Sequence, residues 1–419
     1  MESIERFVLE QLAAWEVPGC AVAVVHDGHV VLAAGWGQRD LETKLPVTSN
    51  TLFAIGSTTK AFTAATVGAL VEDGLLEWER PLRDYVPEIR LNDPVVTDRL
   101  TVIDLLSHRS GLPRHEMVWL GHPGRSRAEV VRRLRFLPLS KDLRQEFQYC
   151  NLGYLAAGYA VEMLSGTPWE DYLRTRLLAP LGMSRSNLSA GDMTADPDHA
   201  TAYERRQGVV VPVPQRPVTA LAPAGAVNSC AADMARWLMA QLGGGQVDGR
   251  AVMSPGTVAR QHAPHIVLPE DRTFPASTRH AYGLGWLVGR YRDHRLLEHG
   301  GNLERHGRHD FLNGVVRRWK HGGEFHSHGH ERCRHHQVRP SIGGDHGTRA
   351  ATGHCRLHHQ GRNYLDLQRS CPGRPVCERG LLRCRAGDRH RDQPAAYDLF
   401  ALSEWFRKEF AHQQWQERI

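Results

Sequence analysis

The string Ser57-Thr58-Thr59-Lys60 and the small-residue run after it, 61–73, constrain this chain most strongly. Gly56 ends a turn just before Ser57, which predicts a helix that opens at Ser57 with Lys60 one turn along. Residues three apart on a helix share a face, so the Lys60 amine is expected to reach the Ser57 hydroxyl. A partly buried lysine can take a serine's proton and make it a nucleophile. The alternative is an N-cap serine beside a solvated lysine, because such a string also occurs by chance.

The composition indicates a soluble globular protein. The chain has 419 residues, of which 41% are hydrophobic and 23% charged, enough for a large core in one or two domains. No apolar run approaches the ~20 residues of a membrane span. The first residues, Met1–Arg6, are acidic and amphipathic rather than a secretory signal, which predicts a cytoplasmic product unless the true start lies upstream. The net charge of +6 does not by itself indicate nucleic-acid binding.

The first part of the chain predicts an antiparallel sheet with helices packed against it. Apolar residues recur at helical spacing up to Trp15, and Pro18-Gly19 ends that helix. Asp27-Gly28 separates two β-rich runs in the manner of a hairpin. The strand-like segments are 21–25, 30–34, 51–55 and 282–292.

Segment 61–223 is predicted to be an all-helical insertion. Its first helix has small residues on several sides, which favours burial at the centre of the fold. Thr101 is expected to cap a short helix, and Gly166 to end a longer one. The basic stretch 125–137 has helical spacing, and its charge pattern predicts a solvated face. Residues 184–223 read as loop.

Three short strings follow one another along the chain: Ser57–Lys60, Tyr149-Cys150-Asn151 and His299-Gly300-Gly301. This order resembles the serine β-lactamase and penicillin-binding-protein superfamily, in particular its class C-like branch of D,D-peptidases, esterases and D-aminopeptidases. The resemblance covers roughly residues 17–302. Further strings that look like that branch are Leu-Leu-Ser-His-Arg-Ser-Gly-Leu at 105–112, Pro-Leu-Gly-Met at 180–183 and Tyr-Gly-Leu-Gly-Trp at 282–286.

The resemblance implies a β-lactamase/transpeptidase-like fold of the α+β class, an α/β sandwich whose antiparallel sheet is flanked by helices and joined to an all-helical subdomain. It also implies that Ser57 forms an acyl-enzyme, that Lys60 helps to deprotonate it, and that Tyr149 relays the proton to the leaving group. A tyrosine has an ordinary pKa near 10, so this relay requires that cations such as Lys60 lower the pKa of Tyr149. Taken alone, Tyr149 could instead be a core tyrosine.

The resemblance assigns the substrate-binding side to the second and third strings. Asn151 matches an amide that holds Lys60 and a substrate carbonyl, although it could also be a plain N-cap. His299 stands where β-lactamases keep a lysine, and could also be structural. The strand backbone beyond Gly301 and the Ser57 N–H would form an oxyanion hole, while the glycines let substrate lie against the strand. The predicted substrate-binding residues are Asn151, His299, Gly300, Gly301 and Asn302.

The third string departs from the pattern of the D,D-peptidases. Gly300 has no hydroxyl to bind a substrate carboxylate, and the motif has no lysine. This favours substrates that lack a terminal carboxylate, such as esters or amides.

The predicted function is a serine acyl hydrolase that acts on D-alanyl peptides, β-lactams or small esters. The alternatives are a carboxylesterase of the same fold and a penicillin-binding sensor that is acylated once without turnover. The expected partner is a small-molecule or peptide substrate. We expect no metal, cofactor, nucleic acid or transmembrane segment.

Residues 303–419 do not continue the family pattern, so the predicted domains are 1–302 and an atypical segment, 303–419. This segment is rich in His, Arg and Cys, and no methionine follows Met253. A metal-binding tail would need finger-like Cys and His spacing, which is missing. A nucleic-acid-binding tail would need more aromatic residues. We favour a change of reading frame near Leu303, a hypothesis that fails if the shifted frame of the nucleotide sequence encodes no apolar strands.

Overall fold

The computed structural model describes residues 2–115, 118, 122, 124–206, 209–215, 217–269, 277–292, 294–301 and 317–318. Its α-helices are α1 (Glu2–Trp15), α2 (Thr59–Glu72), α3 (Pro94–Arg99), α4 (Val102–Leu106), α6 (Arg127–Arg133), α7 (Asn151–Ser165), α8 (Trp169–Leu173), α9 (Ala179–Leu181), α10 (Ala190–Ala195), α11 (Ala222–Gly225), α12 (Ala231–Leu242) and α13 (Pro255–His262). Shorter or irregular helical turns are η1 (Gly56–Thr58), η2 (Leu82–Asp84), η3 (Leu134–Phe136) and η4 (Arg174–Leu178).

The strands form antiparallel ladders, so helices and antiparallel sheets combine in an α+β fold as predicted. They are β1 (Gly19–His26), β2 (His29–Gly37), β3 (Phe53–Ala54), β4 (Ala202–Arg206), β5 (Val209–Val213), β6 (Asn228–Ser229), β7 (Gln246–Val247), β8 (Arg250–Ala251), β9 (Ile266–Val267), β10 (Ser277–Tyr282), β11 (Leu287–Tyr291), β12 (His294–Glu298) and β13 (Arg317–Arg318).

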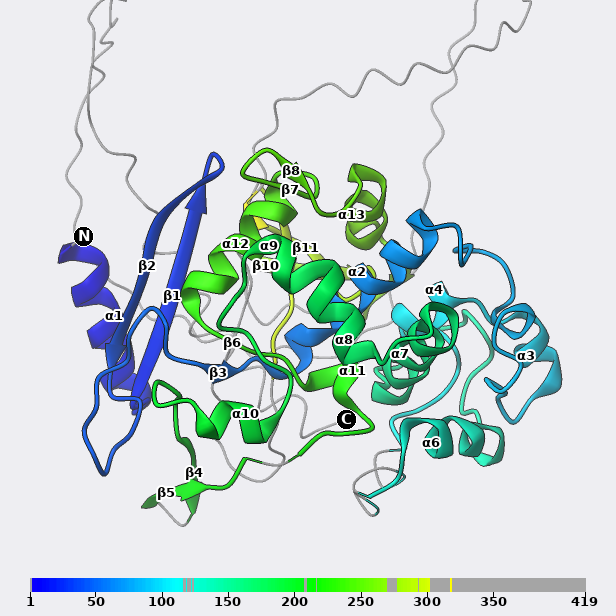
Figure 1. Cartoon of the computed structure of the whole chain (residues 1–419), viewed down its shortest axis with the longest axis horizontal. Helices are drawn as coiled ribbons and strands as arrows, with labels where there is room; N and C mark the ends of the chain where they lie inside the picture. Colours follow the sequence, from blue (N-terminus) through cyan, green and yellow to red (C-terminus); the bar gives the residue numbers. More distant parts are fainter. Residues whose placement is uncertain are drawn as a thin grey trace, which may run out of the picture. The chain divides into compact units, whose positions relative to one another are not determined.

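Helix α1 lies along the β1–β2 hairpin (Figure 1), which confirms the predicted first elements. Val8 and Leu12 of the helix are buried in one cluster with Leu32 of β2, because apolar residues at helical spacing face the same side. The hairpin turns through Asp27 and Gly28, whose φ angles are 48° and 79°. Two consecutive positive φ angles match the right-handed twist of the strands.

The larger sheet has the strand order β13-β12-β11-β10-β9. The predicted strand 282–292 is instead the end of β10, a turn and β11, with Gly285 in the turn at a φ of 80°. This turn packs directly on α2, since a Cβ added to Gly285 would lie 2.7 Å from the Ala61 Cα. Within the described residues, β1 and β2 form a sheet of their own rather than part of the predicted single sheet. Strand periodicity indicates β structure, whereas strand pairing depends on long-range packing.

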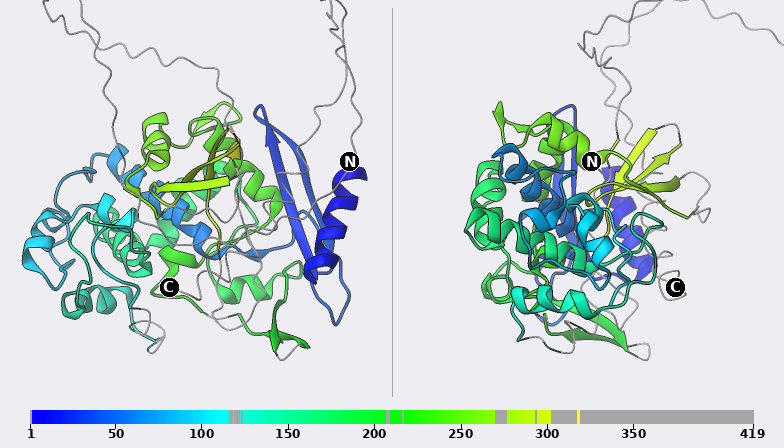
Figure 2. Two further views of the ribbon diagram at one scale, coloured as in Figure 1. Left: turned by 180° about the vertical axis from the view of Figure 1, so that it is seen from behind. Right: turned by 90° about the vertical axis from the view of Figure 1, so that its right-hand side faces the viewer.

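Helix α2 is the centre of the fold, and its residues Thr59–Leu70 are all buried. It lies between the strands β10–β12 and the helices α7 and α8 (Figure 2). The small side chains make this possible: a Cβ on Gly68 would come within 2.3 Å of Thr257 on α13. The predicted buried central helix is confirmed.

The insertion 61–223 is mainly helical, but the prediction that it is all helical was wrong. Thr101 caps α4 in a reciprocal capping box with Asp104, and Gly166 ends α7 at a φ of 68°, both as expected. In the region predicted as loop, α10 and the β4–β5 hairpin form. The β5 sequence Val-Val-Val-Pro-Val has no clear alternation, so period 2 did not reveal it.

Of segment 303–419, the structure describes only the backbone of Arg317–Arg318, which pairs with β12 as β13. The other residues of this segment, to which the frame-change hypothesis applies, lie outside the described residues. No described helix has the length and apolar character required to traverse a lipid bilayer.

Candidate active site

Ser57 lies in a 3-10 turn, η1, immediately before α2. The preceding residues are held in place because β3 pairs with β6 and the Ile55 N–H donates to the Val227 carbonyl at 3.0 Å. Gly56 adopts a φ of 49°, which bends the chain so that the side chain of Ser57 stays partly exposed while its neighbours are buried. The hydroxyl therefore sits at the N-terminal end of a buried helix, where negative charge is favoured.

Lys60 is fully buried, and its amine contacts the Ser57 hydroxyl. The Lys60 Nζ donates to Ser57 Oγ at 2.9 Å and to the Ala224 carbonyl on α11 at 2.9 Å. Helix α11 is anchored to α2 by the Thr63 hydroxyl, which donates to the Pro223 carbonyl at 2.6 Å. The predicted spacing of serine and lysine on one helical turn thus brings the two groups into hydrogen-bond contact.

Tyr149 reaches the same serine from 92 residues further along the chain. Its hydroxyl donates to Ser57 Oγ at 2.7 Å, and the Lys60 Nζ lies 4.8 Å from the centroid of its ring. One serine oxygen is therefore within hydrogen-bond distance of an amine and a phenol, the two groups that could exchange its proton.

Asn151 is the first residue of α7 and half-buried, so it lies one step beyond the capping position. The N-cap is Cys150, and no side chain caps this helix end. The plain N-cap interpretation of Asn151 therefore does not describe this helix.

His299 is buried, and its ring nitrogens contact protein atoms. Its Nε2 lies 2.9 Å from the Tyr282 hydroxyl, and its Nδ1 lies 2.5 Å from the Gly300 carbonyl. Burial first, and then the charge of Lys60, lowers the pKa of His299 to about 3, so the ring is neutral. Both ring nitrogens have protein partners, and the substrate-binding role of this residue stays a prediction.

Gly301 is required by the nucleophile turn itself. A Cβ added there would lie 1.8 Å from the Ile55 carbonyl oxygen and 2.9 Å from the Ser57 nitrogen. The Thr58 hydroxyl also donates to the His299 carbonyl at 3.3 Å, which ties the segment after β12 to the turn. Gly301 therefore gives room to the backbone next to Ser57, and its role in substrate binding stays a prediction. The predicted residue Asn302 lies outside the described residues.

The sequence did not predict a role for the aromatic cluster behind Tyr149. The ring of His108 lies 4.4 Å from the ring of Tyr149 and 4.9 Å from that of Tyr282, measured between centroids. Arg114 lies over the Tyr149 ring at 5.3 Å. The available signal is the two strings 105–112 and 282–286, which resemble strings of the superfamily but do not by themselves indicate this contact.

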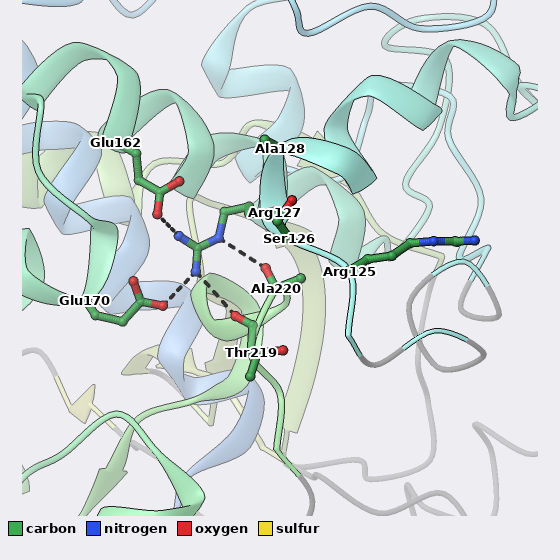
Figure 3. A pocket seen from close by; sticks show the side chains of 8 residues that line it. All are labelled: Arg125, Ser126, Arg127, Ala128, Glu162, Glu170, Thr219 and Ala220. Carbon is green, nitrogen blue, oxygen red and sulfur yellow. Dashed lines mark hydrogen bonds and ion pairs between the residues drawn. The ribbon is translucent and has the colours of Figure 1, made fainter.

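A surface hollow of about 360 Å³ lies elsewhere, beside α6 and α7 (Figure 3), and none of the predicted site residues lines it. Arg127 occupies it, paired with Glu162 and, at 2.7 Å, with Glu170. Its guanidinium also donates to the carbonyls of Ala220 and Thr219. Arg127 is only 8% exposed, so the prediction of a solvated basic face was wrong for this residue. Each polar contact joins protein to protein, which indicates a structural clamp.

We expect the free energy of unfolding to fall as the pH drops from 6.5 toward 3. His299 and His108 are buried and have a lowered pKa in the folded protein, so the unfolded chain binds their protons first. The stabilisation from each neutral imidazole is therefore complete above the unfolded pKa near 6.5. Below that pH, each imidazole can lower the free energy of unfolding by up to about 1.4 kcal/mol per pH unit.

Urea denaturation at a series of pH values measures this slope. The variant His299→Gln is expected to have a shallower slope than the wild type, whereas His280→Gln, at an exposed histidine, is expected to keep the wild-type slope. Equal slopes in all three proteins would contradict the assignment of His299 as a buried neutral imidazole.

Comparison with known proteins points to one family. The family model described as Beta-lactamase matches residues 4–313. The chain is 33% identical over 322 residues to Unguisins hydrolase ungD′ of Aspergillus campestris. The matched region covers 72% of this chain and 57% of that protein. The chain thus spans little more than half the length of this curated relative.

Solved structures agree with this similarity. The fold matches the octameric penicillin-binding protein homologue from Pyrococcus abyssi with a TM-score of 0.62 and 28% identity, over 72% of this chain and 68% of that chain. It matches D-amino acid amidase from Ochrobactrum anthropi SV3 with a TM-score of 0.58 and 26% identity, over 72% of this chain and 84% of that chain.

Proposed function

Because the chain belongs to the Beta-lactamase family, we propose that it is a serine acyl hydrolase whose nucleophile is Ser57. The observation that carries this proposal is the contact of two proton-transfer groups with one oxygen. The Lys60 Nζ lies 2.9 Å and the Tyr149 hydroxyl 2.7 Å from Ser57 Oγ.

The reaction proceeds in two halves. Ser57 Oγ bonds to the substrate carbonyl carbon while its proton passes to the Lys60 and Tyr149 pair. The tetrahedral intermediate collapses, the bond to the leaving amine or alcohol breaks, and that group takes the proton from the pair. Water then attacks the acyl carbon and gives a proton to the pair. The bond from that carbon to Ser57 Oγ breaks, Oγ takes the proton back from the pair, and the acid leaves. Each turnover consumes one water molecule and cleaves one amide or ester bond.

The negative charge on the carbonyl oxygen requires donors in place before the reaction. The Ser57 N–H at the start of α2 is one candidate donor, in the region of the helix dipole that favours an anion. The close approach of Gly301 to the Ser57 nitrogen, 2.9 Å for an added Cβ, places the segment after β12 beside that donor. We assign the second donor to this segment.

We propose amides and esters without a carboxylate beside the scissile bond as the substrate class. In the third motif, Gly300 has no hydroxyl, and His299 is neutral with both nitrogens engaged by Tyr282 and Gly300. No side chain of that motif is therefore available to pair with a substrate carboxylate. The name of one similar protein, a D-amino acid amidase, supports amide substrates.

We also propose that residues 1–302 form the hydrolase domain. The family match to residues 4–313 supports this division. Sequencing the gene tests the proposed frame change near Leu303, because the shifted frame must encode apolar strands and a C-terminal helix for that idea to stand.

A panel of substrates tests the function and its class. The panel contains p-nitrophenyl esters, D-phenylalanine amide, a D-alanyl-D-alanine peptide with a free carboxylate, and nitrocefin. We expect the ester and the amide to be hydrolysed with kcat/KM at least about 10-fold above the two carboxylate-bearing substrates, the scale of one lost charge-assisted contact.

Other outcomes discriminate the alternatives. Faster turnover of the D-alanyl peptide or nitrocefin would overturn the proposed substrate class and favour a D,D-peptidase or β-lactamase. A stoichiometric burst of labelling by fluorescent penicillin without steady-state turnover of any substrate would indicate a sensor. Hydrolysis of esters without amides would indicate a carboxylesterase.

A further inference from the structure

His108 is a buried imidazole next to the site that the proposed chemistry does not use. It follows α4 in a turn, is 1% exposed and has a φ of 60°. Positive φ angles are uncommon for residues other than glycine and cost energy, so the surroundings must hold this conformation.

Two hydrogen bonds connect His108 to the residues on either side of Tyr149. The Gln148 N–H donates to the His108 carbonyl at 2.8 Å, and the Cys150 N–H donates to the His108 Nδ1 at 3.0 Å. A backbone N–H is always a donor, so Nδ1 must be the unprotonated nitrogen of a neutral ring. The proton then resides on Nε2, which is buried and has no hydrogen-bond partner among the described residues.

The imidazole itself packs on the Tyr149 ring. The two rings are 4.4 Å apart between centroids and inclined by 34°, and Phe147, Tyr154 and Tyr282 surround the remaining sides at 4.9 to 5.5 Å. These rings hold the His108 imidazole in place, so it gives the Tyr149 ring a fixed surface on one side.

The electrostatic surroundings keep this imidazole uncharged. Burial is the main cause that lowers the pKa of His108 well below its usual value, and the positive charges of Lys60 and Arg114 and the neighbouring His299 add to it. The other titratable groups that face the ring are the phenols of the three tyrosines, Tyr149, Tyr154 and Tyr282. A neutral ring is the form that accepts the Cys150 N–H.

We propose that His108 is a positioning residue that holds the Tyr149 phenol against Ser57. It does so by binding the backbone on both sides of Tyr149 and by packing on its ring. The inference rests on the proposed function, since it assigns His108 a part in the same proton transfer. A shift of about 1 Å in a catalytic group can cost about 100-fold in rate, so the 2.7 Å contact of Tyr149 with Ser57 depends on this support.

Two substitutions at His108 separate positioning from folding. His108→Asn keeps a side-chain oxygen near the position of Nδ1, and asparagine tolerates a positive φ, but the ring is lost. His108→Ala removes both the acceptor and the ring. The acylation rate is measured from the burst of p-nitrophenol from an ester and is normalised to the burst size, so that unfolded molecules do not count.

We expect the acylation rate to decrease from wild type to His108→Asn to His108→Ala, with losses of about 10-fold and about 100-fold, and with KM within about 2-fold of the wild type. The partial rescue by asparagine and the selective loss in kcat would not arise from a merely structural role. If His108→Ala fails to fold, His108→Asn compared with the wild type carries the test.

His262→Asn is the matched control, because this imidazole is also buried, at 4% exposure, and packs edge-on to Trp286. It is expected to keep the wild-type acylation rate per active site. Wild-type acylation rates in both His108 variants would overturn the inference, and so would a rise in KM as large as the loss in kcat. Either result would leave the proposed function intact. A burst that persists in Ser57→Ala would instead refute the proposed function.

Discussion

Replacing Ser57 with alanine is expected to abolish covalent labelling by fluorescent penicillin and to lower ester turnover by at least about 10⁴-fold. The substitution removes the oxygen that both Lys60 and Tyr149 contact, so no acyl-enzyme can form. The fold should remain, because the Ser57 side chain is partly exposed and its backbone is held by neighbouring residues. Labelling on a denaturing gel and a burst assay measure the effect, and circular dichroism confirms folding.

Ser165→Ala is the matched control for this experiment. Its hydroxyl donates to the Val161 carbonyl at the far end of α7, about 21 Å along the helix from Asn151. We expect full labelling and turnover in this variant. Retained turnover in Ser57→Ala would remove Ser57 from the mechanism and leave the contacts of Lys60 and Tyr149 without a catalytic explanation.

Gly301→Ala is expected to lower acylation by at least about 100-fold and to destabilise the protein by about 2–3 kcal/mol. The added Cβ would lie 1.8 Å from the Ile55 carbonyl oxygen and 2.9 Å from the Ser57 nitrogen, and because both of these are backbone atoms, no side chain can rotate away. The nucleophile turn or the strand segment must move. Thermal unfolding and the ester burst measure the two effects.

The control is Gly191→Ala, where the nearest atom to an added Cβ is 3.9 Å away and the residue lies within α10. Alanine is a better helix former than glycine, so we expect stability equal to or slightly above the wild type. A wild-type Tm and burst in Gly301→Ala would show that the segment after β12 does not press on the Ser57 turn.

The elements that could be predicted from the sequence are those stabilised by near neighbours. The Asp27-Gly28 turn, the Thr101 capping box and the Gly166 helix end all depend on residues a few positions apart. The contact of Ser57 with Lys60 belongs to this class, because one helical turn sets the distance between them.

The rest of the fold and of the site depends on contacts between distant segments, which no local pattern encodes. Nothing near Arg127 indicates that Glu162 and Glu170 will bury it, and the charge pattern alone predicted a solvated face. His108 is similar: its string resembled a family motif, yet its hydrogen bonds to the neighbours of Tyr149 appear only when the two loops meet.

Tyr149 and His299 show which features of the site cannot be predicted from the local sequence. The three motifs lie together in the structure, but Tyr149 reaches Ser57 because α7 packs on α2, and the His299 ring contacts the Tyr282 hydroxyl on β10. Spacing along a chain specifies which groups share a helix face or a turn. The direction in which a buried side chain points is set instead by the free energy of packing and of satisfying its polar atoms in the assembled core.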